Sequence, residues 1–339
     1  MDEIVGPQFS QTPDPYENQL RPKSFADFID QSSVVENLRV YINAARDRGD
    51  MLDHVLLTGP PGLGKTTLAH ILAAEMGHPL IAQSGPALDR PAKLLSILTS
   101  LDQGFVIFID EIHRMPNIVA EYLYTAMTDF KIELAVDQGF GGNRLPFELS
   151  QFTLVGATTS EGMLLSPFRD RFKIEEKLTF YPPDELFNVV MRTARILGVK
   201  IDADAAKIIS ARARGTPRIT NKYVARIRDF AQEWDAEKIT TDVTEKALDR
   251  LGVDGCGLTR LDREILGVLA RSGGKAVGLK TIAVSVSEEP RTIEEKYEPF
   301  LIQQGFILKT PQGRVPTKKA FEHIDAVPPN QSQGKLFDA

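Results

Sequence analysis

The stretch GPPGLGKTT from Gly59 to Thr67 holds the residues best suited to chemistry in this chain. It fits the phosphate-binding template G-x-x-x-x-G-K-[ST], in which Gly62 and Gly64 let backbone N–H groups approach a polyphosphate. An apolar run at 54–58 comes before it and a helix-forming run at 68–76 follows. This strand–loop–helix context favours a nucleotide site over the alternative of a surface turn with an incidental lysine.

Three side chains at the end of this loop would contact the nucleotide directly. Lys65 would reach the β- and γ-phosphates, and Thr66 would complete the ligand shell of a Mg²⁺ ion. Thr67 would contact the α- and β-phosphates through its amide or hydroxyl group. The predicted ligands are therefore a nucleoside triphosphate and Mg²⁺.

Two adjacent carboxylates follow a second apolar strand, predicted at 106–109. A buried parallel strand would deliver Asp110 to the carboxyl edge of the sheet, where ligands of such folds bind. There Asp110 would hold Mg²⁺, directly or through water, and Glu111 would orient or deprotonate the attacking water. An acidic helix cap is the alternative. The chain has no Asn-Lys-x-Asp-like guanine reader of the kind that an exchange-type GTPase needs.

Polar residues farther along the chain would complete the site. Thr158 and Thr159 end the strand predicted at 152–157, where a hydroxyl could sense the γ-phosphate, unless both were selected for β propensity. Arg171 lies in the loop SPFRDRF and is suited to act as an arginine finger toward a neighbour's nucleotide. Arg218, in GTPR at 215–218, could contact the phosphates within its own subunit. The alternative for Arg171 is a solvated surface charge.

Composition restricts the class of protein. The chain has 339 residues, a net charge of −6 and one cysteine, Cys256, which excludes an intramolecular disulfide framework. No apolar run approaches the roughly 20 residues that would cross a bilayer, and the N-terminus lacks a signal-peptide core, so we expect a cytoplasmic protein. Residues 255–324 have 11 Lys/Arg and 8 Asp/Glu, which makes this C-terminal part the electropositive one.

The pattern of the chain predicts an α/β domain at 20–181, between an N-terminal arm at 1–19 and the rest of the chain. Strands are expected at 55–58, 79–82, 106–109 and 152–157, and helices at 32–49, 66–76, 91–101 and 117–127. Their alternation is typical of a parallel sheet with flanking helices.

Two further domains are expected after Pro182-Pro183. Four helices at 184–197, 204–214, 219–234 and 242–251 indicate a small all-α domain at 182–254. The Gly-rich segment 252–257 reads as a flexible joint. Helices at 261–272, 279–286 and from Pro290 onward, followed by a hairpin at 306–317, predict a winged-helix DNA-binding domain at 255–324, with a tail at 325–339.

Several strings in this order resemble one family, the AAA+ ATPases. They are LRP at 20–22, the phosphate loop, FIDEIHR at 108–114, GATT at 156–159, FRDRF at 168–172, ARILGV at 194–199 and GTPRI at 215–219. Within that family the wording resembles the bacterial motors that migrate Holliday junctions, and TIEEKYEP at 292–299, LIQQGF at 301–306 and GRV at 313–315 fit their winged-helix head. The resemblance covers residues 20 to 324.

This resemblance implies a hexameric ring with ATP and Mg²⁺ at the subunit interfaces, an ATPase that pumps duplex DNA in recombination and repair. It also assigns nucleotide contacts: Leu20, Arg21, Gly62, Gly64, Lys65, Thr66, Thr67, Thr128, Asp129, Phe130, Thr159, Arg171, Tyr181 and Arg218. Catalytic roles fall to Lys65, Asp110, Glu111 and Arg171, and Mg²⁺ ligation to Thr66 and Asp110.

The resemblance further implies partners. Arg291, Lys309 and Arg314 match positions that contact DNA phosphates, although Lys309 stands where arginine is usual and Gln312 replaces a basic residue. A β-hairpin at about 132–152 would dock on the junction-binding protein RuvA, and the resolvase RuvC would join the larger complex. The hairpin's wording around 139–143, Gly-Phe-Gly-Gly-Asn, departs from the family's.

Other kinds of AAA+ protein remain as alternatives. A protein unfoldase usually has an aromatic pore loop, and residues 83–104 contain no aromatic residue. A clamp loader would carry zinc-binding cysteines and a helical collar. A DNA-binding switch that uses ATP only to change shape would need neither Glu111 nor Arg171.

Overall fold

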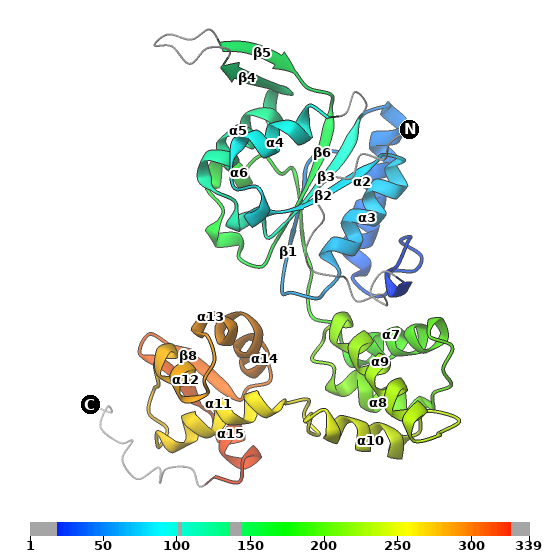
Figure 1. Cartoon of the computed structure of the whole chain (residues 1–339), viewed down its shortest axis with the longest axis vertical. Helices are drawn as coiled ribbons and strands as arrows, with labels where there is room; N and C mark the ends of the chain where they lie inside the picture. The colour runs from blue at the N-terminus through cyan, green and yellow to red at the C-terminus, as the bar shows by residue number, and fades with distance from the viewer. Residues whose placement is uncertain (1–18, 101–103, 136–143, 327–339) are drawn as a thin grey trace, which may run out of the picture. The chain divides into compact units, whose positions relative to one another are not determined.

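The computed structural model describes residues 19–100, 104–135 and 144–326 (Figure 1). They form two compact units. Unit 1 contains the described residues up to Val199 together with Gly215–Val224, and unit 2 contains Lys200–Arg214 and the described residues from Ala225 onward. No helix in these described ranges is long and apolar enough to span a membrane.

Unit 1 is built on a sheet of five parallel strands in the order β2-β3-β6-β1-β7. The strands are β1 (Val55–Thr58), β2 (Leu80–Ser84), β3 (Phe105–Asp110), β6 (Phe152–Thr158) and β7 (Ile174–Lys177). The helices are α2 (Ser32–Arg48), α3 (Lys65–Met76), α4 (Pro91–Leu98), α5 (Asn117–Asp129), α6 (Ser166–Arg169) and α7 (Pro183–Ile196), with short 3₁₀ turns at Gly85–Ala87, Ile112–Arg114 and Glu161–Met163.

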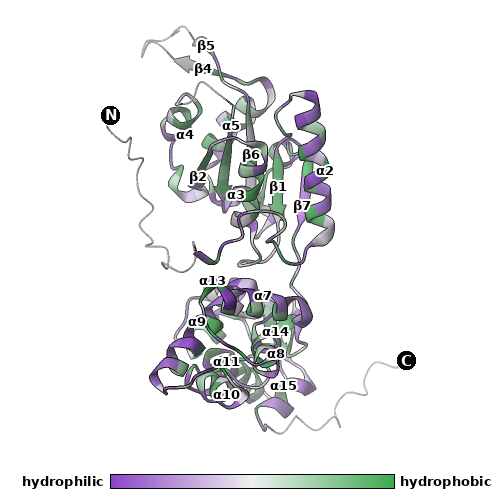
Figure 2. Cartoon of the chain, turned by 90° about the vertical axis from the view of Figure 1, so that its right-hand side faces the viewer, coloured by the Kyte–Doolittle hydropathy of each residue, from purple (hydrophilic) through white to green (hydrophobic). Residues whose placement is uncertain are grey.

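Both faces of this sheet are covered. Helices α2 and α3 pack together on one face, and α4 and α5 cover the other (Figure 1). The central strands β1, β3 and β6 are almost entirely buried, which is why they read as continuous apolar runs and are hydrophobic in Figure 2. The predicted parallel sheet with flanking helices is confirmed.

A two-stranded hairpin follows α5. β4 (Lys131–Ala135) pairs antiparallel with β5 (Arg144–Glu148), and Lys131 lies opposite Glu148 at its base. Ile132 is buried in the core under α4 and α5, so the hairpin is anchored to the domain at that end. The Gly-Phe-Gly-Gly-Asn string lies outside the described residues.

Unit 2 begins with four helical segments, which lie in the predicted all-α domain and at the start of the predicted winged helix. They are α8 (Ala203–Arg212), the second part of α9 (Pro217–Glu233), α10 (Thr241–Arg250) and α11 (Arg260–Arg271). Then come α12 (Leu279–Ser285), α13 (Pro290–Thr292), a π turn (Ile293–Tyr297), α14 (Glu298–Gln303), β8 (Ile307–Thr310), β9 (Gly313–Pro316) and α15 (Lys318–His323). Together with α11, this last set forms a winged helix around one apolar core.

The π turn between α13 and α14 has a local cause. Pro299 lacks the N–H group that would donate to the carbonyl four residues earlier, and a wider turn accommodates this gap in an otherwise continuous helix. The third helix of the winged helix therefore contains a π turn before its second half.

The Gly-rich segment 252–257 is held in place, contrary to the expected flexible joint. The Asp254 carboxylate accepts hydrogen bonds from the amides of Cys256 and Leu258. The Arg214 guanidinium donates to the Gly257 carbonyl and forms a buried ion pair with Asp262 of α11. Within unit 2, α11 is thus fixed to the end of α8.

Candidate functional site

The phosphate-binding loop leaves the carboxyl end of β1 and enters α3 at Lys65. Gly59, Gly62 and Gly64 have φ values of 130°, 79° and 103°, a region that residues with a side chain rarely adopt. A Cβ atom on Gly59 would also lie 2.4 Å from the carbonyl oxygen of Leu178. Both conformation and space therefore require glycine in this loop.

The GTPR segment lies directly against the phosphate loop. A Cβ atom on Gly62 would lie 2.7 Å from Cγ2 of Thr216 and 3.2 Å from Cβ of Arg218. The Arg218 amide also donates to the Gly62 carbonyl at 3.4 Å. On the other side, a Cβ atom on Gly64 would lie 2.9 Å from the ring of Phe28. Arg218 was predicted to contact the phosphates within its own subunit. It lies against the phosphate loop, at Gly62.

Lys65 is buried at the first position of α3 and is only 7% exposed. Its ammonium group donates to the carbonyl oxygens of Gly59 at 2.7 Å and Pro60 at 2.8 Å. Burial lowers the pKa of Lys65 to about 8, although the nearby charges of Asp110 and Glu111 oppose this shift. A desolvated lysine beside amide groups is suited to bind phosphate oxygens.

The two carboxylates stand at the carboxyl end of β3, as predicted. Burial raises the pKa of Asp110, while a hydrogen bond from the Glu111 amide (2.9 Å) and the charge of Lys65 act in the opposite direction. Glu111 has a left-handed φ of 48°, and its carboxylate forms a half-exposed ion pair with Arg114 at 2.6 Å. The two neighbours therefore have different surroundings: Asp110 is partly buried near Lys65, and Glu111 pairs with Arg114.

The site supplies the ligands that Mg²⁺ prefers. Thr66 and Thr67 are half-buried in the first turn of α3, beside the loop that would hold the phosphates. A Thr66 hydroxyl and an Asp110 carboxylate are hard oxygen donors, and Mg²⁺ is commonly held by one or two protein groups together with substrate phosphates. The residues present fit the ion.

The end of β6 distinguishes the two threonines. Thr158 is 1% exposed, and its hydroxyl contacts Nδ1 of His113 at 2.9 Å and accepts a hydrogen bond from the Ser160 amide at 3.0 Å. Thr159 is exposed at the sheet edge. Thr159 is therefore the better placed of the two to meet a ligand, and Thr158 ties β6 to the turn after Glu111. Sequence patterns did not indicate this role of His113, which they placed only within FIDEIHR.

Leu20 and Tyr181, which the family resemblance assigns to the nucleotide, are both buried. The Leu20 carbonyl accepts a hydrogen bond from Arg192 at 2.7 Å. The Tyr181 hydroxyl donates to the Leu63 carbonyl at 3.4 Å, and its amide to the Gly215 carbonyl at 2.9 Å. Burial raises the pKa of Tyr181, so the phenol stays protonated.

Arg21 lies on the same side of the loop. The pKa of His70, on α3, is lowered by burial and further by the charge of Arg21. The structure therefore brings Arg21 near α3, the helix that follows the phosphate loop.

Arg171 lies at the other end of the sheet. It comes three residues before β7 begins, whereas the phosphate loop follows the carboxyl end of β1, which runs parallel to β7. Its guanidinium carbon lies 4.6 Å from the centroid of the Tyr124 ring, and Nη2 donates to the Tyr124 hydroxyl. Within one subunit the structure does not bring Arg171 to Lys65.

Thr128, Asp129 and Phe130 are also remote from the phosphate loop. Phe130 packs edge-on against Phe152, the first residue of β6, with ring centroids 5.6 Å apart. Six residues separate Phe152 from the carboxyl end of this strand, a length of about 20 Å. The Thr128 hydroxyl donates to the Tyr124 carbonyl at 3.0 Å, so Thr128 and the residue that Arg171 contacts, Tyr124, lie on the same helix, α5.

The three basic residues predicted to contact DNA lie in the winged helix and face carboxylates. Arg291 pairs with Glu295 at 2.6 Å, and Lys309 with Glu294 at 2.8 Å, both half-exposed. Their exposure leaves them able to meet a phosphate.

Arg314 differs from the other two because it is only 9% exposed. Its guanidinium bonds the buried carboxylate of Glu298 and lies 3.5 Å from Glu294. The predicted phosphate contact of Arg314 would have to coexist with this internal pair, which the sequence did not indicate.

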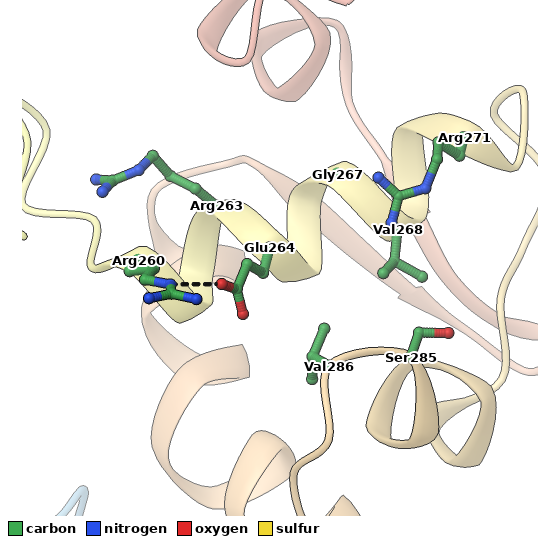
Figure 3. Close-up of a pocket in the computed structure, with 8 residues that line it drawn as sticks. All are labelled: Arg260, Arg263, Glu264, Gly267, Val268, Arg271, Ser285 and Val286. Atoms are coloured by element: carbon green, nitrogen blue, oxygen red, sulfur yellow. Dashed lines mark hydrogen bonds and ion pairs between the residues drawn. The ribbon is translucent and has the colours of Figure 1, made fainter.

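A shallow groove of about 360 Å³ crosses another part of the winged helix, between α11 and the end of α12 (Figure 3). Arg260, Arg263 and Arg271 lie along α11 and Val286 faces them from α12. Arg260 bonds Glu264 at 2.7 Å, and Arg263 bonds Asp254. Two of these three arginines are thus already paired.

Comparison with known proteins gives the same family along the chain. Residues 20–178 match the profile of the Holliday junction DNA helicase RuvB P-loop domain, residues 181–254 that of the RuvB AAA lid domain, and residues 255–325 that of the RuvB C-terminal winged helix domain.

Individual relatives agree with these profiles. The chain is 50% identical over 322 residues to the Holliday junction branch migration complex subunit RuvB of Myxococcus xanthus, covering 95% of this chain and 94% of that protein. It is 52% identical over 323 residues to the same subunit of Chlorobium luteolum, again covering 95% and 94%. Among solved structures, the Thermotoga maritima RuvB Holliday junction branch migration motor superposes with a TM-score of 0.84 at 44% identity, covering 92% of this chain and 100% of that one.

Proposed function

This chain belongs to the RuvB family, and we propose that it is an ATP-driven motor that pumps duplex DNA and migrates the branch point of Holliday junctions. The observation that carries the proposal is the order of three RuvB profiles over residues 20–325, with a phosphate loop and two carboxylates meeting at one edge of the sheet. We place the domains at 20–181, 182–254 and 255–324. The proposed cellular role is homologous recombination and DNA repair in the cytoplasm.

One half of the proposed ATP site lies within a subunit. The loop amides and Lys65 bind the β- and γ-phosphates, and Thr66 and Asp110 hold Mg²⁺, which when bound neutralises charge developing on the phosphates. Glu111 orients or deprotonates the attacking water, and Thr159 contacts the γ-phosphate from the next strand. Leu20, Arg21 and Tyr181 enclose the nucleotide base. The remaining proposed contacts within the subunit are Gly62, Gly64, Thr67 and Arg218.

The other half comes from a neighbouring copy. Arg171 and the group Thr128–Phe130 lie at the amino end of the sheet, about a strand length from their own phosphate loop. In a homohexameric ring they would face the nucleotide of the next subunit, where the planar Arg171 cation stabilises charge on the transferred phosphoryl group. Hydrolysis then requires two subunits.

The partners follow from the family. Holliday junction arms would contact the winged helix through their backbone, with Arg291, Lys309 and Arg314 as the proposed phosphate ligands. RuvA would dock on the hairpin β4–β5, where Phe147 is 43% exposed, and RuvC would join the larger complex. Backbone contacts predict DNA affinity that falls steeply with salt.

The decisive experiment is ATP-dependent dissociation of a synthetic four-way junction, with and without RuvA. We expect Lys65→Ala and Glu111→Gln to abolish turnover and dissociation while DNA binding by the head is kept. Glu121→Gln, at an exposed carboxylate of α5, is the isosteric control and should behave like the wild type. Turnover within a few-fold of the wild type in Lys65→Ala or Glu111→Gln would contradict the site. ATP-dependent movement on linear duplex DNA without junction dissociation would instead indicate a general DNA translocase.

Mixed rings test the split site. Arg171→Ala subunits are expected to disable the site of a neighbour, so that activity falls faster than in proportion as they are titrated into wild-type rings. A strictly proportional loss would show that each subunit hydrolyses ATP alone.

A further inference from the structure

Arg171 is held by a neutral partner, unlike the arginines around it. Arg169, two residues earlier, bonds two carboxylates, Glu161 at 2.5 Å and Glu175 at 2.6 Å. Among the residues that the structure describes, no carboxylate lies within ion-pair distance of Arg171. Its hydrogen bond goes to the phenol of Tyr124. The same short loop thus neutralises one guanidinium and leaves the charge of the other uncompensated.

The contact with Tyr124 fixes the guanidinium in two ways. The ring stacks under it at 4.6 Å, and the hydroxyl accepts a hydrogen bond from Nη2. The Nε atom is buried with no hydrogen-bond partner, so the inner part of the side chain is also enclosed. A cation over a neutral ring keeps its charge, because the ring contributes only its quadrupole.

We propose that Tyr124 is the positioning residue of the arginine finger. It holds Arg171 extended and immobile while leaving its charge available to a phosphate. This inference rests on the proposed function, in which Arg171 acts on the neighbour's nucleotide.

Physical chemistry favours a phenol over a carboxylate at this place. A free arginine side chain loses rotamer entropy when it is fixed, and a finger that is fixed beforehand does not lose it during hydrolysis. A carboxylate would fix the guanidinium equally well, but the phosphate would then have to compete with it. Tyrosine restrains the guanidinium without competing with the phosphate for its charge.

The place of Tyr124 in the fold adds to this argument. It stands on α5, one turn before Thr128, whose hydroxyl bonds the Tyr124 carbonyl. Tyr124, which holds Arg171, and Thr128, which belongs to the other group proposed to reach the next subunit's nucleotide, therefore stand on the same helix. A rigid helix fixes their relative positions better than two separate loops would.

The test compares Tyr124→Phe, Tyr124→Leu and Arg171→Ala in assembled rings on linear duplex DNA, with kcat and KM for ATP and ring assembly measured separately. Loss of the hydroxyl in Tyr124→Phe should lower kcat by about 3- to 10-fold, and loss of the ring as well in Tyr124→Leu by about 10- to 100-fold. KM should stay within a factor of two, because the finger acts on the transition state. Tyr122→Phe, on the opposite side of the same helix, is the matched control and should leave kcat unchanged.

A double-mutant cycle separates positioning from a general effect on folding. Tyr124→Phe should lower kcat much less in an Arg171→Ala background than in the wild type, because the tyrosine acts through the arginine. Wild-type or faster turnover in Tyr124→Phe, together with an impaired Arg171→Ala, would overturn the inference and leave the proposed function standing. Equal losses in both backgrounds would also overturn it. Unimpaired turnover in Arg171→Ala would instead overturn the split site itself. If Tyr124→Leu does not assemble, the Tyr124→Phe result decides.

Discussion

Replacing Arg314 by alanine should act mainly by destabilising part of the winged helix, and less by removing a direct contact with DNA. Arg314 is 9% exposed and bonds Glu298, which is 2% exposed. Removing one partner of a buried ion pair leaves an uncompensated charge in the interior, at a cost of about 3 to 5 kcal/mol. Lys309 approaches the same pair from the surface and is half-exposed, so Lys309→Ala should cost less than about 1 kcal/mol.

Hydrogen exchange of the full-length chain measures this difference locally. A loss of about 3 to 5 kcal/mol would lower the protection of the amides in β8 and β9 by about two to nearly four orders of magnitude in Arg314→Ala. Peptides from the sheet of unit 1 serve as the internal reference, and Lys309→Ala as the matched variant. If Arg314→Ala loses DNA affinity while β8 and β9 keep their protection, Arg314 is a phosphate ligand and the buried pair is not what holds the wing.

Two further predictions concern the phosphate loop. Because the pKa of Lys65 is about 8 and phosphate binds its protonated form, ATP affinity should be highest below pH 8 and fall by up to about tenfold per unit above it. Equilibrium nucleotide binding between pH 7 and 9.5 checks this, and a Lys65→Arg variant should lack the decline if it binds. Gly62→Ala should weaken ATP binding by about tenfold or more, because its Cβ would lie 2.7 Å from Thr216 at a φ of 79°. Gly77→Ala has a similar φ of 71° with open space around it, and should leave ATP affinity unchanged.

Local patterns predicted most elements well, and the exceptions have physical reasons. The strand at 55–58 and the order of strands and helices up to β6 were predicted because central parallel strands are continuous apolar runs. β7 was not predicted, because Ile174–Lys177 lies at the sheet edge, where charged residues replace the apolar run. The short helix at Lys318–His323 was also missed, although Thr317 caps it by accepting from the Ala320 amide.

Long-range contacts account for what the sequence could not predict. Glycines at 252–257 indicate a flexible backbone when they are considered alone. In unit 2, however, Arg214 binds this segment from outside and the Asp254 carboxylate binds it from within. Arg314 was assigned to DNA by its match to a family position, and nothing in the neighbouring sequence indicates its internal partner, Glu298. Tyr124 gave no signal at all, since its partner lies 47 positions away in the chain.

The length of the parallel sheet separates the two halves of the proposed ATP site. Every strand delivers its ligand-binding residues to one edge, so Lys65, Asp110 and Thr159 meet because parallel strands end together. Arg171 precedes the next strand and must lie at the opposite edge for the same reason. No side-chain movement spans the distance between the two edges of one sheet. In the proposed ring, an arginine finger in this position would serve the neighbouring copy, because its own phosphate loop lies at the opposite edge of the sheet.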